Sequence, residues 1–522
     1  MSAVIPAPSA GESSEGRCLV ARPWHVLTES RELQRVAATV RELAAPHLES
    51  VSATGRMVSA GVLRLAVADV GPAPSALGVS PGSDAQPDEG YRLTVESDQI
   101  ICQARTPEGV FRAAVSALHL LAAAPSKGLA CGWIEDTPRY AWRGLMVDPA
   151  RHFLTVGELR EVIDLAALYK LNVLHLHLTD NEGWRIEVPG RPELTAGQPH
   201  YTVAEYRELQ AYAARRFVTV VPEIDLPGHS AASLRAYPKL GTVGLPEWVP
   251  EGAPFAPALD PRDEVTRAFV IEVLTEVARA TAGAFVHFGG DEALGMDSER
   301  FAEAVVLARE VIRDCGKQPL GWQESARAGV SPGEIAQWWV DVPMMDLPDG
   351  EEELALRPEL VKAGMTMPFV RALTGIFTPT NEDFSRIVDG GARVLLSPQS
   401  HLYLDRPYDL AVVPEERHAD AERIGFAYRP RDLRYTAAWD PAVYGLAPEQ
   451  VAGIEATLFA ETVRDFDDLV TLLLPRLAGV AEVAWTGAVP RWEEYRERLA
   501  GQAQLWRERG LTALLSTEVD WR

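Results

Sequence analysis

Eight short apolar segments, separated by longer stretches, constrain the fold of this chain more than any other feature. They are RGLMVD (143–148), NVLHLHL (172–178), VTVVPEI (218–224), AFVHF (284–288), PLGWQE (319–324), EIAQWW (334–339), RVLLSP (393–398) and GIEATLF (453–459). Amphipathic helices are predicted between several of them, at 156–170, 203–216 and 263–281. Eight buried strands alternating with helices predict a (β/α)8 TIM barrel, an α/β fold that usually needs about 250 residues or more.

One connection in this pattern is unusually short. The fifth segment ends at 324 and the sixth begins at 334, which leaves almost no room for the helix expected between them. The connection from 340 to 392 is unusually long in turn, and we expect it to form a lid, a wall for the group beyond the reacting bond, or a subunit contact. The pattern does not choose among these three.

A smaller domain is predicted before the barrel. Residues 90–104 alternate apolar and polar side chains as hairpin strands do, and residues 106–124 have the pattern of a helix. We therefore expect a small α+β domain over 17–135 and the barrel domain over 136–522. Residues 1–16 are small, polar and rich in Pro and Gly, which predicts a disordered tail.

Composition excludes some classes of partner. The chain has 50 Lys and Arg against 74 Asp and Glu, a net charge of −24, which opposes binding to nucleic acid or to an anionic membrane. No apolar run approaches the ~20 residues of a membrane span, and the N-terminus lacks the features of a signal peptide, so we expect a cytoplasmic protein. The four cysteines are far apart without C-x-x-C spacing, which predicts free thiols. Whether the chain is a monomer or a homo-oligomer stays open.

Polar and aromatic residues follow all eight predicted strands, and the C-terminal ends of the strands are where such barrels build their active sites. These residues are Arg151, His152, Asp180, Glu223, Asp225, His229, Asp291, Glu292, Trp322, Glu324, Trp338, Trp339, Tyr403, Asp405 and Glu461. Many carboxylates, several tryptophans and the absence of a glycine-rich phosphate loop favour a sugar as the ligand. Hydrolysis of a glycoside ordinarily needs an acid that protonates the leaving oxygen.

The pair Asp291 and Glu292 is the best candidate for that chemistry. Gly289 and Gly290 precede it and relax the backbone, so the two acids need not point to opposite faces as neighbours in a strand do. An ionised Asp291 should raise the pKa of Glu292, because like charges oppose each other's ionisation. A general acid needs such a raised pKa to stay protonated near neutral pH.

Several ordered motifs resemble glycoside hydrolase family 20, the β-N-acetylhexosaminidases. They are RGLMVDPARHF, YKLNVLHLHLTDNEGWRIEV, VPEIDLPGHS, LDP, HFGGDE, GWQE, SPQSHLYLD and GIEATLFAE, and the resemblance spans about 90 to 490. It implies an exo-acting, retaining hydrolase of terminal N-acetylhexosamine β-glycosides, in which the substrate's own acetamido group attacks and forms an oxazolinium ion. Glu292 would then be the general acid and base, while Asp291 and Tyr403 would hold the acetamido group.

The same resemblance implies the rest of the sugar pocket. Trp322 and Trp339 would form its walls, and Asp180 and His229 would lie behind Glu292. The residues expected to bind sugar hydroxyls are Arg151, Asp405 and Glu461. Phe459 stands where the family usually has tryptophan, which keeps an aromatic wall but removes an N–H donor. The substrate would be a small molecule or an oligosaccharide, and no cofactor or metal is expected.

Two other functions remain open at this point. The H-x-H pair His175 and His177 on a barrel strand is also typical of metal-dependent amidohydrolases, although we expect these histidines to pack within the barrel or to support the residues that face the site. Phe459 and the long 340–392 segment suggest a sugar-binding pseudoenzyme of the same fold. Neither the group attached to the sugar nor the preference between gluco and galacto configuration can be inferred from the pattern.

Overall fold

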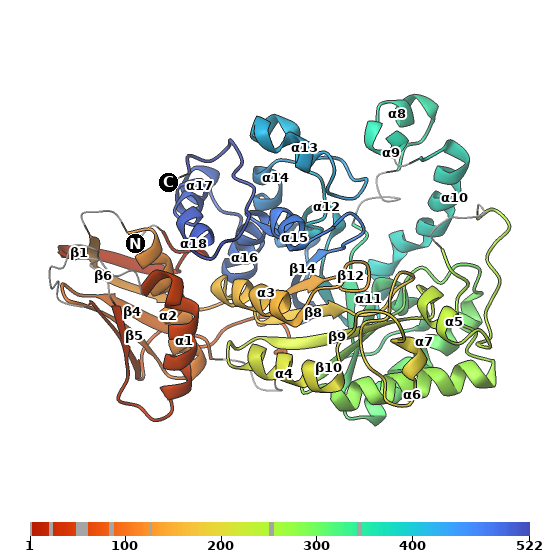
Figure 1. Cartoon of the computed structure of the whole chain (residues 1–522), viewed down its shortest axis with the longest axis horizontal. Helices are drawn as coiled ribbons and strands as arrows, with labels where there is room; N and C mark the ends of the chain where they lie inside the picture. The colour runs from red at the N-terminus through yellow and green to blue at the C-terminus, as the bar shows by residue number, and fades with distance from the viewer. Residues whose placement is uncertain are drawn as a thin grey trace.

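The structure is a computed structural model that describes residues 3–19, 24–48, 61–82, 88–124, 128–249, 255–341, 347–362 and 364–521. A small N-terminal domain lies beside a larger barrel domain (Figure 1). The order of elements agrees with the predicted class, a (β/α)8 barrel preceded by a small α+β domain.

The small domain contains a mixed sheet with the strand order β1-β6-β4-β5-β3-β2 among its described residues. The strands are β1 (Ala10–Cys18), β2 (Trp24–Leu27), β3 (Gly61–Val67), β4 (Tyr91–Val95), β5 (Gln99–Ala104) and β6 (Leu129–Asp136). The predicted hairpin is present, because β4 and β5 are antiparallel with Tyr91 opposite Ala104. Helices α1 (Gln34–Leu48) and α2 (Pro107–Ala122) pack together, and α2 begins after Thr106, whose hydroxyl accepts the Gly109 N–H at 3.0 Å.

The prediction of a disordered tail over 1–16 is wrong for residues 3–16, the part of it that the structure describes. Residues 10–18 form the edge strand β1, which pairs antiparallel with β6. Val4 and Ile5 are fully buried, and the Ile5 N–H donates to His119 Nδ1 at 3.2 Å. Every residue of β1 before Cys18 is exposed, so this strand lacks the alternating apolar pattern from which strands are predicted. Backbone hydrogen bonds to β6 order it instead.

The barrel closes in the order β10-β11-β12-β13-β14-β7-β8-β9, with parallel pairing throughout. Its strands are β7 (Arg143–Val147), β8 (Val173–His177), β9 (Thr219–Leu226), β10 (Phe285–Gly289), β11 (Gln318–Trp322), β12 (Ile335–Trp338), β13 (Arg393–Leu396) and β14 (Val451–Leu458). Each overlaps one of the predicted segments. The eight-strand prediction is therefore confirmed.

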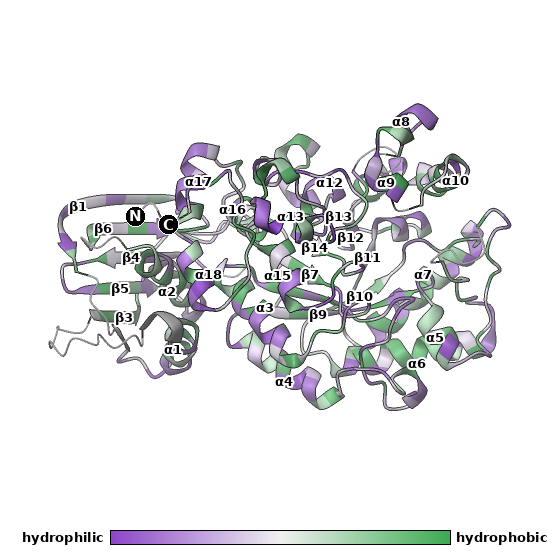
Figure 2. Cartoon of the chain, turned by 45° about the horizontal axis from the view of Figure 1, so that its top comes forward, coloured by the Kyte–Doolittle hydropathy of each residue, from purple (hydrophilic) through white to green (hydrophobic). Residues whose placement is uncertain are grey.

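The outer layer of the barrel is mostly helical. Its elements include α3 (Val156–Leu168), α4 (Val203–Ala214), α5 (Ala231–Ala236), α6 (Glu264–Ala280), α7 (Ser298–Asp314), α15 (Phe466–Leu473), α16 (Arg476–Thr486), α17 (Trp492–Ala500) and α18 (Ala503–Glu508). Reciprocal hydrogen bonds between Thr155 and Glu158, and between Thr202 and Glu205, begin α3 and α4. Figure 2 shows largely hydrophilic residues on α17, at the surface.

The short connection after β11 holds a 3-10 helix, η2 (Gln323–Ala328), in place of an α-helix. The long connection after β12 contains α8 (Glu351–Ala355), α9 (Pro358–Lys362), α10 (Met367–Phe377), η4 (Thr378–Glu382) and α11 (Asp383–Asp389). Helix α11 packs against both η2 and β13. It therefore fills the part of the outer layer that η2 is too short to cover, while α8, α9 and α10 stand away from the strands (Figure 1).

The connection between β13 and β14 is built from short helices. These are α12 (Gln399–Leu402), η5 (Leu410–Val412), η6 (Glu415–Arg417), α13 (His418–Ala421), α14 (Leu433–Ala437), η7 (Pro441–Tyr444) and η8 (Pro448–Gln450), and η1 (Pro192–Leu194) precedes α4. Among the described residues no single helix has the length and apolar character of a membrane span, and only the pair α15 and α16, bent by 48°, passes that test together.

Buried ion pairs join the two domains. Asp136, at the end of β6, accepts hydrogen bonds from Lys170 Nζ at 3.1 Å and Trp485 Nε1 at 2.9 Å, both in the barrel domain. Glu89 of the small domain contacts Arg143 Nη2 at 2.6 Å. These charges are compensated within the protein, which a buried ion requires. The four cysteines form no disulfide, as expected.

Candidate active site

A cavity of about 850 Å³ opens at the C-terminal ends of the barrel strands. Ten of the predicted site residues line it: Arg151, Asp180, His229, Asp291, Glu292, Trp322, Trp339, Tyr403, Phe459 and Glu461. Asp405 does not, because it is buried behind this wall, where its backbone carbonyl accepts the Phe426 N–H at 2.8 Å. The strand-end pattern thus brings nearly the whole predicted set together.

The two neighbouring acids face the same partner. His229 Nε2 lies 3.4 Å from Asp291 Oδ2 and 3.6 Å from Glu292 Oε2. A sharp turn allows this arrangement, because Gly289 and Gly290 have φ of +73° and +95°, and Glu292 has φ of +43°. Side chains of adjacent residues would alternate in an extended strand. The expectation that the glycines free the pair from this alternation is confirmed.

Behind the acids lies a chain of charged groups. His229 Nδ1 is 3.0 Å from Asp180 Oδ1, and Arg151 Nη2 is 2.7 Å from Asp180 Oδ2. Burial alone would raise the pKa of Asp180, but His229 and Arg151 hold that pKa well below its usual range. Burial likewise opposes charge on His229, yet Asp180, Asp225 and Asp291 raise its pKa well above the usual value. The imidazole is therefore a cation held beside Glu292.

Burial is the main reason why the pKa of Glu292 is raised, to about 7. The charge of His229 opposes this rise, and the charge of Asp291 adds to it. Asp291, from which this rise is predicted, acts in the expected direction but is not its largest cause. A carboxyl with this pKa is protonated in a large fraction of molecules near neutral pH, as a general acid requires.

Aromatic side chains surround the space in front of the acids. Trp339 and Tyr403 stack with their ring centres 6.0 Å apart, and Phe459 lies 5.4 Å from Tyr403 and 6.3 Å from Trp322. The Trp322 indole N–H donates to Glu223 Oε1 at 2.7 Å, which fixes the ring. Trp338, predicted at the same rim, instead packs on Phe384 and Tyr444 outside the cavity. Neighbouring residues at a strand end face opposite sides.

Asp225 and Glu324, predicted only as residues at strand ends, have unusual surroundings near the acid pair. Among the described residues, neither carboxylate oxygen of Asp225 has a hydrogen-bond partner, and burial and the charge of Asp291 raise its pKa well above the usual value. Glu324 accepts the Trp339 indole N–H at 3.2 Å, and burial followed by Asp291 raises its pKa to about 8. Both follow predicted strands, so the pattern contained them without separating them from other rim acids.

Tyr428 is a wall residue that the sequence did not reveal. Its ring meets Tyr403 edge-on with centres 6.2 Å apart. It comes from the irregular connection between β13 and β14, where no strand end marks a position as facing the cavity. The topology of that connection had to be known before the residue could be placed.

The histidines of the H-x-H pair lie inside the barrel. Glu223 contacts His177 Nδ1 at 2.6 Å, His287 Nδ1 at 3.1 Å and His175 Nε2 at 3.2 Å. Groups such as His175, Glu223 and His287 are close enough together to hold a metal ion. Hydrogen bonds already engage His175 Nδ1 with Glu455 at 2.8 Å and His177 Nδ1 with Glu223 at 2.6 Å, whereas His175 Nε2 and His287 Nε2 have no hydrogen-bond partner among the described residues. His175 is fully buried, and His177 reaches the cavity and contacts Asp180 at 2.9 Å, which agrees with packing and supporting roles for the two histidines.

Comparison with known proteins identifies the family. A family model described as glycosyl hydrolase family 20, catalytic domain, matches residues 140–488, and one described as glycosyl hydrolase family 20, domain 2, matches residues 1–137. The chain belongs to glycosyl hydrolase family 20. It is therefore a glycoside hydrolase of the β-N-acetylhexosaminidase class.

Relatives in glycosyl hydrolase family 20 match nearly the whole chain. A beta-N-acetylhexosaminidase of Cellulomonas fimi is 36% identical over 537 residues, which cover 99% of this chain and 97% of that one. A beta-hexosaminidase of Akkermansia muciniphila is 32% identical and covers 80% and 83%. The solved structure of Streptomyces plicatus N-acetyl-beta-hexosaminidase in complex with Thio-NAglucal has a TM-score of 0.77 at 31% identity and covers 100% and 98%. Family membership favours the hexosaminidase interpretation of the H-x-H strand over the amidohydrolase one.

Proposed function

We propose that this glycoside hydrolase removes terminal N-acetylhexosamine from the non-reducing end of β-glycosides with retention of configuration, using the substrate's acetamido group as the nucleophile. The observation that carries the proposal is the pair Asp291 and Glu292, both facing His229 at one end of an aromatic cavity. Because the two adjacent acids lie on the same side of the glycosidic bond, one can donate a proton to it while the other holds the nucleophile. Family 20 is also an exception to the scheme in which a second carboxylate attacks the sugar.

In the first step Glu292 donates its proton to the glycosidic oxygen as the bond to the anomeric carbon breaks. The acetamido oxygen supplies the electron pair that forms the new bond to that carbon, which gives an oxazolinium ion. Asp291 accepts a hydrogen bond from the acetamido N–H and stabilises the positive charge that develops there. Tyr403 donates its hydroxyl proton in a hydrogen bond to the acetamido oxygen and fixes its direction of attack.

In the second step the Glu292 carboxylate removes a proton from water as that water attacks the anomeric carbon. The bond to the acetamido oxygen breaks, and its electrons return to the amide. Two displacements on the same carbon restore the original configuration. The His229 imidazolium, tied to Asp180 at 3.0 Å, stabilises Glu292 while it is ionised between the two steps.

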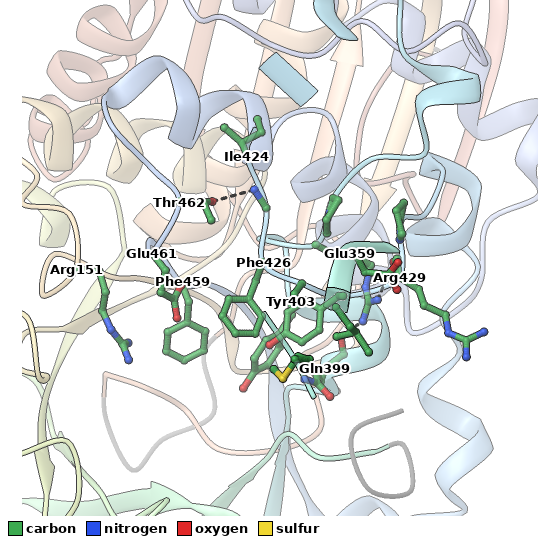
Figure 3. A pocket seen from close by; sticks show the side chains of 18 of the residues that line it. Arg151, Glu359, Gln399, Tyr403, Ile424, Phe426, Arg429, Phe459, Glu461 and Thr462 are labelled. Carbon is green, nitrogen blue, oxygen red and sulfur yellow. Dashed lines mark hydrogen bonds between the residues drawn. The ribbon is translucent and has the colours of Figure 1, made fainter. Parts of the chain in front are cut away.

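The Arg151 end of the cavity is rich in charged groups that suit a terminal sugar, which supports action at chain ends. Arg151 contacts Asp180 at 2.7 Å, Glu182 at 3.0 Å and Asp148 at 3.4 Å, so this wall is held by ion pairs. Arg151 and Glu461 lie together at that end and are placed to bind sugar hydroxyls (Figure 3). Trp322, Trp339 and Phe459 provide apolar faces for the pyranose ring.

Stepwise fluorination of the N-acetyl group tests the nucleophile. Fluorine withdraws electrons from the acetamido oxygen, so kcat/KM should fall steeply from the acetyl to the trifluoroacetyl aryl glycoside. Asp291→Asn serves as the internal comparison, because it weakens the grip on the acetamido group and should lower kcat for the unfluorinated substrate by about 10²-fold or more. A flat fluorination series in the wild-type enzyme would exclude participation by the acetamido group.

The pseudoenzyme alternative makes a different prediction. Phe459 keeps its ring against Tyr403 and beneath the Arg151 guanidinium, 5.5 Å from the ring centre, so the substitution does not remove the wall. Tight binding of a thiazoline that mimics the oxazolinium ion, with no hydrolysis of any hexosaminide, would favour a sugar-binding protein over the proposed enzyme.

A further inference from the structure

The cavity extends well beyond the residues that hold the sugar. In Figure 3, Arg151, Phe459 and Glu461 lie at one end, and Glu359 and Arg429 lie at the other. The far part lies between two segments that the proposed mechanism does not use: the β12–β13 connection, with α9 and α10, and residues 421–431. We call this part the aglycone chamber, lined by Leu347, Leu360, Met365, Phe369, Leu373 and Ile424. If the terminal sugar is held by Arg151 and Glu461, as proposed above, the group attached to it extends toward this chamber.

A continuous row of aromatic rings leads from the sugar pocket into the aglycone chamber. Trp339 stacks on Tyr403, Tyr403 meets Tyr428 at 6.2 Å, and Phe426 lies 5.0 Å from Tyr428. The loop that carries the last two rings is fastened to the barrel, because the Gly425 N–H donates to Thr462 Oγ at 2.8 Å (Figure 3). This side of the chamber is therefore an extension of the sugar pocket's own wall.

The opposite side of the aglycone chamber is also aromatic. Phe369 of α10 lies 6.4 Å from Phe255, which belongs to the loop after β9. Leu373 and Phe377 of α10 pack in the same cluster as Trp322, Trp339 and Tyr403. The long connection after β12 thus forms a wall of the cavity, which is one of the three roles left open by its sequence.

Several of the charged groups at the far end of the chamber contact other protein groups, whereas Arg431 lies over the Tyr435 ring, 4.5 Å from its centre. Arg357 forms an ion pair with Glu359, and Arg429 Nη2 lies 3.6 Å from Glu353. Arg406 donates to the backbone carbonyls of Gln399 and Arg429 at 3.0 and 2.9 Å. What these pairs leave facing the cavity is mainly aliphatic and aromatic surface. A second sugar ring would place several hydroxyls against that surface and lose hydrogen bonds to water.

We propose that the aglycone chamber binds an apolar aglycone, an alkyl or aryl group attached directly to the N-acetylhexosamine, and that it selects such glycosides over oligosaccharides. The volume of about 850 Å³ lies toward the upper end of the roughly 300–1,000 Å³ of pockets that hold drug-sized ligands, so it accommodates more than one sugar. This inference rests on the proposed function, because it assigns the far part of the cavity to the leaving group.

The test is a series of methyl, butyl and octyl β-N-acetylglucosaminides, each used below its micelle-forming concentration. The three leaving alcohols have nearly the same basicity, so differences in kcat/KM report binding of the chain and not leaving-group chemistry. A fully buried methylene corresponds to about a fourfold change, so even partial burial should raise kcat/KM by about tenfold or more from methyl to octyl. The disaccharide N,N′-diacetylchitobiose, with a sugar as its aglycone, should be hydrolysed with lower kcat/KM than the octyl glycoside.

Variants of α10 assign the effect to the chamber. Phe369→Ala should lower the octyl-to-methyl ratio of kcat/KM by about fivefold, since it removes one apolar wall. Arg371→Ala, an exposed position on the same helix, should leave the ratio unchanged. The ratio is independent of the amount of folded enzyme, so partial misfolding of a variant does not affect it.

Each outcome separates the chamber from the proposed function. A flat alkyl series with ordinary turnover, or a higher kcat/KM for the disaccharide than for the octyl glycoside, would overturn the apolar chamber and leave the proposed hydrolysis intact. Equal octyl-to-methyl ratios of kcat/KM in Phe369→Ala and the wild type would also overturn the apolar chamber and leave the proposed hydrolysis intact. Failure to hydrolyse any hexosaminide would instead overturn the proposed function.

Discussion

Glu292 keeps its proton near neutral pH because its carboxyl is buried, while the His229 imidazolium keeps the ionised form accessible. The two influences oppose each other and leave the pKa at about 7, between that of an ordinary carboxyl and that of a carboxyl buried without a cation. A residue that acts first as an acid and then as a base needs such an intermediate value. Burial and the charge of Asp291 also raise the pKa values of Asp225 and Glu324 in the same region.

The pH dependence of turnover should report this balance. A general acid works when protonated, so kcat/KM for a neutral alkyl glycoside should fall as pH rises through about 7, the pKa of Glu292. Glu292→Gln should lower kcat by about 10²–10⁴-fold on a substrate with a poor leaving group and abolish this basic limb. The measurement is a pH–rate profile for each enzyme.

Glu324→Gln is the matched control for that profile. It replaces a second carboxyl in the site whose pKa is also raised, to about 8, and it should leave the basic limb near pH 7. If the basic limb disappeared in Glu324→Gln and survived in Glu292→Gln, the assignment of Glu292 as the general acid would be wrong.

Single residues were predictable where a strand end placed them. Arg151, Asp180, Trp322 and Glu461 all follow apolar runs, and the common geometry of barrel strand ends brings such residues into one site. Pairing among them was not predictable, because it depends on side-chain directions. Asp225 lies beneath Gly289 with both oxygens unpaired among the described residues, which no spacing in the sequence indicates.

At the scale of elements, the turn after β10 decides how the acid pair is presented. Gly289 has a φ of +73°, and a Cβ added there would lie 1.8 Å from Asp225 Oδ1 and 2.7 Å from Asp225 Cα. The strand therefore ends in a turn that only glycine can make against the neighbouring strand β9. Glu292 itself has a positive φ of 43°, so the strain of the turn extends to the proposed acid.

Gly289→Ala should destabilise the enzyme by about 3 kcal/mol or more, the sum of the left-handed backbone strain and the overpacking against Asp225. Gly316→Ala is the matched control, because Gly316 has the same φ of +73° but no atom within 4 Å of the added Cβ. It should cost only about 1–2 kcal/mol, from backbone strain alone. Denaturant unfolding of both variants checks the difference, and equal losses would show that close packing at Gly289 does not matter.

The barrel strands were predictable because parallel strands are buried on both faces and read as continuous apolar runs. The absence of a helix between β11 and β12 was visible from the length of the connection. Strand β1 was not predictable, since its side chains are exposed on both faces and only its backbone pairs with β6. The position of α11 beside η2 also depends on contacts between segments distant in sequence.

At the scale of the whole molecule, the N-terminal segment ties the two domains together. Ile5 is fully buried with its N–H on His119 of the small domain, and the Ala7 N–H donates to Glu482 of α16 at 2.9 Å. Asp136 makes a second buried connection through Lys170 and Trp485. A substitution that breaks either connection should therefore lower the stability of both domains.

Ile5→Ala should lower the free energy of unfolding by about 2–5 kcal/mol, the usual cost of removing a buried isoleucine side chain. Ser13→Ala, at an exposed position of β1, should change it by less than about 0.5 kcal/mol. Thermal unfolding followed by circular dichroism measures both. If Ile5→Ala behaved like Ser13→Ala, the N-terminal residues would be a disordered tail after all.

The β12–β13 connection has a consequence for how this enzyme diverges from its relatives. Its last helix, α11, belongs to the barrel scaffold, whereas residues 347–377 contact the scaffold mainly through the cavity wall. On the proposed role of the chamber, substitutions at its outer positions such as Leu360 or Phe369 should change the accepted leaving group, whereas Leu373 and Phe377 also support Trp322, Trp339 and Tyr403. The preference for a leaving group can therefore diversify at these outer positions while Asp291, Glu292 and the strands that hold them are kept.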